Sequence, residues 1–590
     1  MLALMYVVQS SFYLGLRREV PRADLDREWL ARLDGIILAI IAGWSVFAFA
    51  CVSLGPLLAY LSPALDLQGT AGGVTAAGVA ASGGLAAWLA RQAKSWAPEV
   101  AKNPTVKQQI DAALPTLLSV AFLLGLLAVV GGQVQANLGK VTVLLFATDT
   151  KPALAGWLHI VSQVVLALIL CILITKLRKI DINRFSIHGL YRNRLVRAFL
   201  GTPRAKRRPD WFTDFDEDDN IRLASLKSGD GGPQKLFPVI NLALNRSSGG
   251  PPGRGERMAA SYTATPLHCG AEELAEQDPR RAFIRTQDFA GREDPKHRDG
   301  GAVPSGISLG SVVAASGAAA SPNFGYHTSA LTAFIMTLFN VRLGLWLPNP
   351  VSKANEPADL AQNRPPDAIR ALLGDLIGRT TLDSRAIYLS DGGHFDNLGL
   401  YEMLRRRCEL IVVVDASADP AGEFFDLGMA IRRAEIDLPV RVTMQKDMHI
   451  QSRKQIESDQ EKARPMTALG VAVGKIEYLP APGQATEVPV PPADRALDDW
   501  RREARTGRLI YIKPTYLPDI PVATRAYGAE HKTFPHETTA DQFFSESQFE
   551  SYHVLGWFQT SKIAEGHADL NALFDAATAH CNSRPPSGRE

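Results

Sequence analysis

The stretch that most constrains the fold is Tyr388-Leu-Ser-Asp-Gly-Gly-His-Phe-Asp-Asn-Leu-Gly399. A short apolar run, residues 386–389, predicts a buried strand that stops at Asp391. Gly392 and Gly393 follow at once, and glycines at such a point permit a positive φ and a close backbone approach. The pattern therefore predicts a carboxylate held in a tight turn at the end of a strand.

The segments after this turn continue the same unit. Residues 398–407 are typical of a helix, and the apolar residues 410–414 are typical of a second buried strand. Strand ends are where α/β proteins tend to hold their chemistry, which favours a functional Asp391. The alternative is a structural turn in which Asp391 only caps the next helix.

The net charge argues against a nucleic-acid partner, and the cysteine content argues against a disulfide framework. The 590 residues carry a net charge of +2, so we expect no nucleic-acid partner. The chain has 5 cysteines without a regular spacing, which predicts reduced thiols facing the cytosol and no disulfide framework.

The first third of the chain is nearly continuous apolar sequence. It contains four predicted membrane spans, residues 35–61, 70–90, 114–130 and 153–175. Lys and Arg gather before the first span, after the second and after the fourth, so both termini are predicted to be cytoplasmic. The second span is rich in Gly and Ala, and the alternative is that it forms an interfacial or re-entrant segment.

Beyond residue 236, strands and helices alternate. Residues 368–377 and 423–434 are typical of helices, residues 440–444 are typical of a strand, and residues 345–350 are interpreted as an aromatic turn. The alternation predicts an α/β layered domain with a largely parallel central sheet. The expected organisation has five parts. They are a basic cytoplasmic N-terminal segment (1–33), a transmembrane region of about four helices (34–176), a basic juxtamembrane connector (177–235), the α/β domain (236–582) and a disordered tail (583–590).

Three motifs together resemble the patatin-like phospholipase family, in particular its bacterial membrane-bearing subgroup. They are Asp391-Gly-Gly with Asn397, the small-residue segment Ala315-Ser-Gly-Ala-Ala-Ala-Ser-Pro-Asn-Phe324, and the strand Pro238-Val-Ile-Asn-Leu-Ala-Leu244. The resemblance implies a patatin-like α/β domain and a multi-pass location in the bacterial inner membrane. It also implies that Asp391 is the base of a Ser-Asp dyad, supported in its turn and cleft by Gly392, Gly393, His394 and Asn397.

The nucleophile of such a dyad is harder to place, because the chain contains no Gly-x-Ser-x-Gly. Ser316, in Ala314-Ala-Ser-Gly-Ala318, keeps small neighbours and is the serine we predict. A second candidate nucleophile, Ser82, lies in an apolar span, where helix packing explains its small neighbours. Residues 228–235 resemble an oxyanion-binding loop, but a solvent turn is the favoured interpretation. The alternative is that the nucleophile half precedes this chain or is supplied by another chain, since Met1 comes almost directly before the first span.

We expect no metal and no cofactor, because His268-Cys269 and His536-Glu537 lack partners at ligand spacing. Asp415 follows residues 410–414 and is expected to lie beside the Asp391 strand. The predicted function is a membrane-anchored serine ester hydrolase whose partners are the lipid bilayer and a phospholipid or acylglycerol substrate. The alternative is a non-catalytic membrane interaction protein, or a truncated half of a patatin-like protein.

Overall fold

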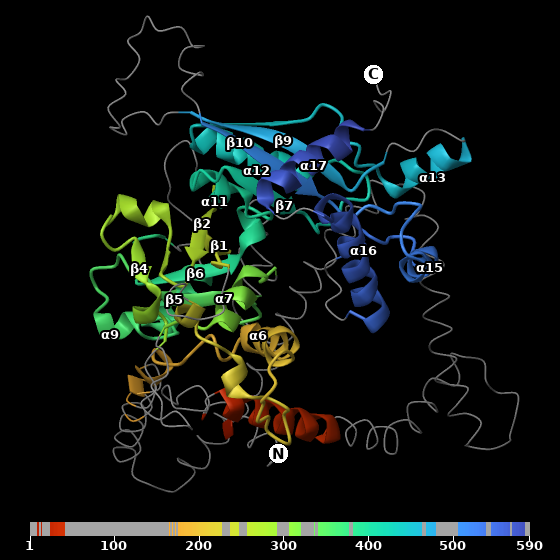
Figure 1. Ribbon diagram of the computed structural model, residues 1–590. Helices are drawn as coiled ribbons and strands as arrows, with labels where there is room; N and C mark the ends of the chain where they lie inside the picture. Colours follow the sequence, from red (N-terminus) through yellow and green to blue (C-terminus); the bar gives the residue numbers. More distant parts are fainter. Residues whose placement is uncertain are drawn as a thin grey trace, which may run out of the picture. The chain divides into compact units, whose positions relative to one another are not determined.

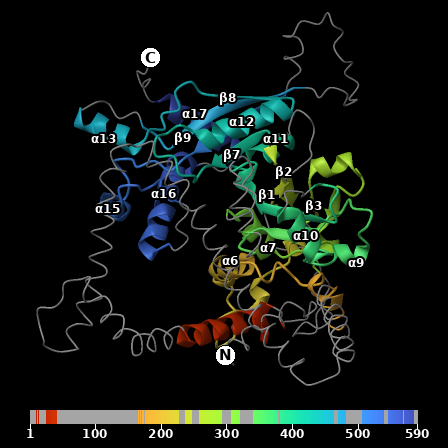
Figure 2. The same cartoon turned by 180° about the vertical axis from the view of Figure 1, so that it is seen from behind.

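The structure is a computed structural model (Figures 1 and 2). It describes residues 9–10, 13, 24–41, 165, 168, 171–172, 175–226, 236–246, 257–291, 306–319, 336, 340–376, 381–462, 468–479, 505–538, 544–566 and 569–583. The chain divides into two compact units. The first holds Met1–Ile240 and Leu244–Ser390, and the second holds Asn241–Ala243 and Asp391–Glu590.

A six-stranded sheet organises the first unit, in the order β4-β3-β2-β1-β6-β5. Neighbours β2 and β3, β3 and β4, and β5 and β6 pair antiparallel. The strands are β1 (Ile240–Asn245), β2 (Ala259–Ala264), β3 (His268–Gly270), β4 (Phe283–Arg285), β5 (Leu345–Pro348) and β6 (Ala386–Asp391).

Apolar side chains of β5 and β6 form a core with the segment that precedes α6. The rings of Trp346 and Tyr388 pack in a tilted arrangement, with their centroids 5.1 Å apart, and Ile180 and Ile182 belong to the same buried cluster. The helices of this unit are α6 (His188–Leu195), α7 (Leu309–Ser316), α9 (Pro357–Leu360) and α10 (Ala368–Leu376). A π-helix covers Val196–Gly201, and 3-10 turns cover Glu217–Asp219, Leu223–Leu226, Glu272–Glu276 and Thr286–Asp288.

A further helix covers residues 24–41 and is bound to α6 and the π-helix through charged side chains. Asp24 pairs with Arg192 at 2.6 Å, and Glu28 pairs with Arg197 at 3.2 Å. The residues predicted to open the first membrane span thus continue a helix that begins with polar contacts to the rest of the unit.

None of the helices in the described ranges combines the length and the apolar sequence needed to cross a membrane. For the residues that the structure describes, the predicted α-helical transmembrane region and the multi-pass location in an inner membrane are therefore wrong. The predicted spans 70–90 and 114–130 lie outside the described residues, and so do most residues of 35–61 and 153–175.

The second unit is built on a four-stranded sheet in the order β7-β10-β9-β8. Strands β7 and β10 are parallel, with Arg508 opposite Leu410, whereas β9 is antiparallel to both β10 and β8. The strands are β7 (Leu410–Val414), β8 (Val440–Met444), β9 (Val471–Tyr478) and β10 (Arg505–Ile512).

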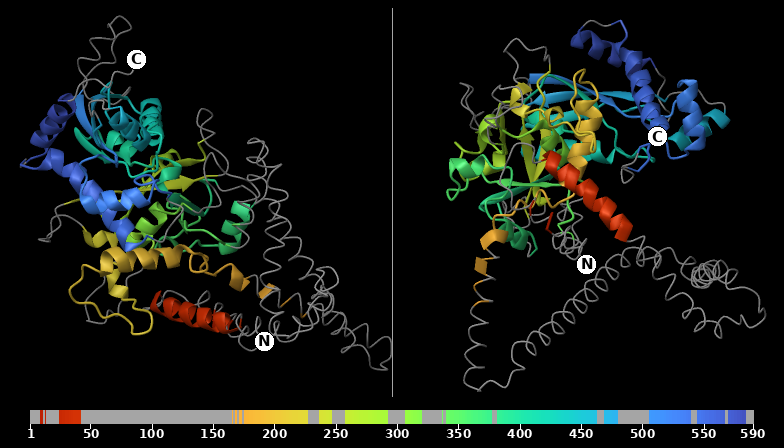
Figure 3. Two further views of the ribbon diagram at one scale, coloured as in Figure 1. Left: turned by 90° about the vertical axis from the view of Figure 1, so that its right-hand side faces the viewer. Right: turned by 90° about the horizontal axis from the view of Figure 1, so that it is seen from below.

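Helices cover this second sheet (Figure 3). Helix α17 packs on β9 and β10, and α12 packs on β8. Phe574 and Ala577 of α17 join Val471 and Ile510 of the strands in one buried cluster. The helices are α11 (Leu400–Arg405), α12 (Phe425–Asp437), α13 (Arg453–Glu461), α15 (Val522–Glu530), α16 (Glu546–Ala564) and α17 (Leu570–Asn582), with a 3-10 turn at Gly392–His394.

The predicted largely parallel central sheet is wrong. The expectation rested on helices between strands, which are typical of parallel crossovers. Here α9 and α10 separate β5 from β6, and α13 separates β8 from β9, yet both strand pairs are antiparallel. A helix between two strands did not set their direction, because a chain segment of this length can return to either end of a strand.

Candidate functional site

The acidic turn begins where the buried part of β6 ends. Ser390 is fully buried, and Asp391 is the first residue of the strand that is partly exposed. The Gly393 N–H donates a hydrogen bond to Asp391 Oδ1 at 2.8 Å. Asp391 thereby caps the short 3-10 turn Gly392–His394. Among the described residues this is the one hydrogen bond to the carboxylate, and Oδ2 receives none.

Both glycines of the turn are required by close packing. A Cβ on Gly392 would lie 2.8 Å from the backbone oxygen of Asn241, and a Cβ on Gly393 would lie 2.7 Å from Asn397 Oδ1. Neither residue has a positive φ; that conformation occurs at Gly399, with φ of 66°. The predicted close approach is thus found at these two glycines, and the positive φ is found six residues further along.

Two side chains connect the turn to the helices that follow. Asp396 accepts hydrogen bonds from the Leu398 N–H at 3.1 Å and the Tyr401 N–H at 2.8 Å, and so caps the start of α11. The Asn397 side chain donates to Asp426 at the start of α12, at 3.0 Å. Asp391, Gly392, Gly393, His394 and Asn397, all predicted from the sequence, thus belong to one short turn of the second unit.

The environment of the turn changes the acidity of two groups. Burial raises the pKa of Asp391, although the Gly393 N–H and the charge of His394 oppose the rise. Burial also lowers the pKa of His394, and the Asp391 carboxylate opposes this. The two values move toward each other. A carboxylate with a raised pKa is a stronger base than an ordinary aspartate, as general-base catalysis requires.

Ser316, the predicted nucleophile, is the last residue of α7 in the first unit. A nucleophile elbow places its serine after a strand and before a helix, where backbone N–H groups point at the substrate. The residues before Ser316 are helical, and a helix exposes carbonyl groups at its C-terminal end. Asp391 belongs to the second unit, and the Ser316–Asp391 dyad stays a prediction. The other serine considered, Ser82, and residues 228–235 lie outside the described residues.

A buried polar cluster that the sequence did not reveal lies at the ends of the parallel strands β7 and β10. Asp415 follows β7 and Lys513 follows β10, and Lys513 Nζ lies 3.0 Å from Asp415 Oδ2. Both side chains are at least 98% buried. Strand β7 pairs with β10 in the four-stranded sheet, so the expectation that Asp415 lies beside the Asp391 strand is wrong. The signal was a charged residue directly after each of two apolar strands.

Every oxygen of the Asp415 carboxylate is used within this cluster. Oδ1 accepts from the Ser417 N–H at 2.8 Å and the Ser417 hydroxyl at 2.6 Å, and Oδ2 accepts from the Tyr511 hydroxyl at 2.5 Å as well as from Lys513. Burial acts to raise the pKa of Asp415, but the hydrogen bonds from Ser417 and Tyr511 and the charge of Lys513 lower it overall. A carboxylate held in this way is a weak base, and we assign the cluster a structural role.

Metal ligands do not gather in the part of the chain that the structure describes: no group of three or more His, Cys, Asp or Glu side chains there could hold a metal ion. Cys269 is buried in β3 against Thr286. His536 accepts a hydrogen bond through Nδ1 from the Asp419 N–H at 3.2 Å, which ties it to the loop after β7.

Comparison with known proteins gives a distant structural similarity and no sequence match. No protein-family model and no curated protein matches the sequence. Among solved structures, human GIVD cytosolic phospholipase A2 is similar with a TM-score of 0.30 and 13% sequence identity. The similarity covers 58% of this chain and 45% of that chain, so this chain spans less than half of the length of that phospholipase.

Proposed function

We propose that this protein is a lipid acyl hydrolase in which Asp391 is the general base. The observation that supports this most is the state of the Asp391 carboxylate. It lies partly exposed at a strand end, with Oδ1 held by Gly393 and its pKa raised by burial. The motif resemblance described above supports an ester of a phospholipid or acylglycerol as the substrate.

The reaction assigned to this turn is a proton transfer coupled to attack on an ester. Asp391 takes the proton of a serine hydroxyl as the serine oxygen bonds to the ester carbonyl carbon. The alcohol part of the lipid then leaves with a proton, and water releases the acid from the acyl-enzyme. Ser316 is the in-chain serine that we propose as nucleophile, on the sequence pattern alone.

The test is the hydrolysis of p-nitrophenyl esters and of phospholipid by the full chain and by Asp391→Asn. Asparagine keeps an oxygen that can accept from the Gly393 N–H, so the turn should persist while the base is lost. We expect kcat to fall by about 10²–10⁴ with little change in KM. Asp575→Asn, which removes an exposed carboxylate paired with Arg508 in the same unit, is the matched control and should leave kcat unchanged.

The outcomes separate the competing roles of the turn. If Asp391→Asn hydrolyses esters as fast as the parent chain, Asp391 is only a capping residue and the proposal fails. If Asp391→Asn is inactive and Ser316→Ala is active, Asp391 keeps its role and the nucleophile is another serine. A chain without any esterase activity would favour the non-catalytic alternative, which the capping hydrogen bond to Gly393 N–H already suits.

A further inference from the structure

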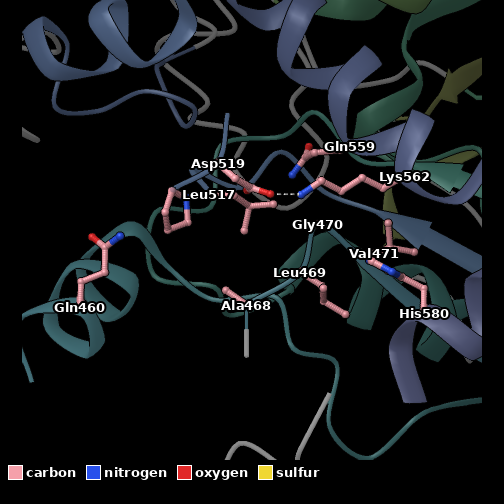
Figure 4. A pocket seen from close by; sticks show the side chains of 11 residues that line it. Gln460, Ala468, Leu469, Gly470, Val471, Leu517, Asp519, Gln559, Lys562 and His580 are labelled. Atoms are coloured by element: carbon pink, nitrogen blue, oxygen red, sulfur yellow. Dashed lines mark hydrogen bonds and ion pairs between the residues drawn. The ribbon is translucent and has the colours of Figure 1, made fainter. Parts of the chain in front are cut away.

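A small pocket lies in the second unit (Figure 4). Its volume is about 270 Å³. The wall comes from the end of α13, the residues that lead into β9, the loop before α15, and helices α16 and α17. The lining residues are Gln460, Ala468, Leu469, Gly470, Val471, Leu517, Pro518, Asp519, Gln559, Lys562 and His580.

One edge of this pocket is charged. Lys562 of α16 forms an ion pair with Asp519 at 2.6 Å, drawn as the dashed line in Figure 4. The Asp519 side chain is 62% exposed, so the carboxylate can turn away into solvent. Exposed ion pairs contribute little to stability, and Lys562 can therefore exchange this carboxylate for another at small cost.

The remainder of the lining is mostly apolar and firmly packed. Leu469, Val471 and Leu517 are 3%, 2% and 4% exposed. Gln559 is 2% exposed, and its Nε2 donates to the backbone oxygen of Thr515 at 3.3 Å. A Cβ on Gly470 would lie 2.1 Å from this Nε2, so the glycine lets the Gln559 side chain fit between the strand and α16.

We propose that this pocket binds a small monocarboxylic acid with a short aliphatic chain. The carboxylate would replace that of Asp519 on Lys562, and the chain would lie against the apolar wall. At about 30 Å³ for each water-sized group, a volume of 270 Å³ holds about nine non-hydrogen atoms. Hexanoate has about this size, whereas most of a long-chain fatty acid would extend beyond the pocket.

This inference goes beyond the proposed function and does not depend on it. The residues that hold the acid come from α16 and the loop before α15, and none belongs to the acidic turn. Binding is measured without any turnover, so a failure here leaves the role of Asp391 untouched. A failure of the hydrolase proposal likewise leaves the pocket untouched.

The test is calorimetric titration of the full chain with hexanoate and, separately, with hexan-1-ol. We expect hexanoate to bind and hexan-1-ol to bind at least about tenfold more weakly, because the alcohol cannot form the charge-assisted contact with Lys562. Lys562→Met should weaken hexanoate binding by about tenfold or more.

The decisive variant is Asp519→Asn. Because it removes the carboxylate that competes for Lys562, hexanoate should bind about two- to fivefold more tightly. A merely structural ion pair would give weaker or unchanged binding, and this result would overturn the proposal. Asp575→Asn makes the same change of charge away from the pocket, and an equal gain there would also overturn it. Equal binding of hexanoate and hexan-1-ol, or unchanged binding to Lys562→Met, would do the same.

Discussion

Alanine substitutions at the two adjacent glycines of the acidic turn test how the turn is packed. An added Cβ would meet a backbone atom at Gly392 and a side-chain atom at Gly393. In Gly392→Ala the new Cβ would lie 2.8 Å from the backbone oxygen of Asn241. Asn241 is part of strand β1, so its backbone cannot move freely. Overpacking of this kind costs about 1–3 kcal/mol, and the loss of unfolded-chain entropy returns about 0.4–1 kcal/mol. We therefore expect a net loss of about 1–2 kcal/mol.

In Gly393→Ala the nearest atom is the side-chain Oδ1 of Asn397, at 2.7 Å. Asn397 is exposed and can rotate, at the expense of its hydrogen bond to Asp426. An exposed hydrogen bond is worth about 0.5–1 kcal/mol, which the entropy term of about 0.4–1 kcal/mol nearly offsets. The expected change in stability is close to zero. The same Cβ lies 3.2 Å from Asp391 Oδ1, so it displaces the proposed base.

The two variants should therefore separate stability from activity. Urea unfolding followed by circular dichroism measures the first, and ester hydrolysis measures the second. We expect Gly392→Ala to lose more stability and Gly393→Ala to lose more activity. If Gly393→Ala proves the less stable of the two, or if both lose stability equally, the packing argument for this turn is refuted.

Three further predictions concern ionisable side chains that burial affects. Asp415→Asn and Lys513→Met should each destabilise the chain by about 3–5 kcal/mol in urea unfolding, because each leaves its partner charged and buried; a double variant that loses the full sum would contradict a direct interaction. Because the pKa of Asp415 is lowered in the folded protein, its carboxylate stabilises the fold above pH 3.8. This stability is lost as the pH falls through the pKa of the folded state, so the stability of Asp415→Asn should depend less on pH in this acid range. Asp391 has a raised pKa, so its contribution is present below pH 3.8 and lost as the pH rises through its folded value. Asp391→Asn should then melt no lower than the parent at pH 7, and a clearly lower melting temperature would contradict this.

Local structure could be read from the sequence wherever local pattern decides it. The strands over residues 410–414 and 440–444 were predicted with the bounds that the structure has for β7 and β8. The helix predicted over 368–377 corresponds to α10, and that over 423–434 to α12. In each case the apolar residues lie within the element, and the residues that end it lie directly beside it in the sequence.

Pairing direction could not be read in the same way. Residues 345–350 were interpreted as an aromatic turn, yet Leu345–Pro348 is strand β5 beside β6. What makes this segment a strand is its partner at residues 386–389, about forty positions further along. The direction of a strand depends on where the intervening chain returns, and that information is spread over the contacts of the whole unit.

The same distinction between local and long-range contacts applies to the candidate site. The turn around Asp391 was found because its capping and packing partners lie mainly between Gly392 and Asn397. The Asp415–Lys513 pair was missed because its members lie 98 positions apart. Nothing near either residue in the sequence shows that they meet, and only the parallel pairing of β7 with β10 brings them together.

The same parallel pair has a consequence for the order of folding. Met444 and Gly474, which pair in β8 and β9, are 30 positions apart, whereas Leu410 and Arg508 in β7 and β10 are 98 apart. Closing the longer loop costs about 1 kcal/mol more in chain entropy, and this cost is offset only when β7 pairs with β10. We expect β8 and β9 to associate early and β7 to dock late. Substitutions at Asp415 should then speed unfolding and leave the refolding rate nearly unchanged.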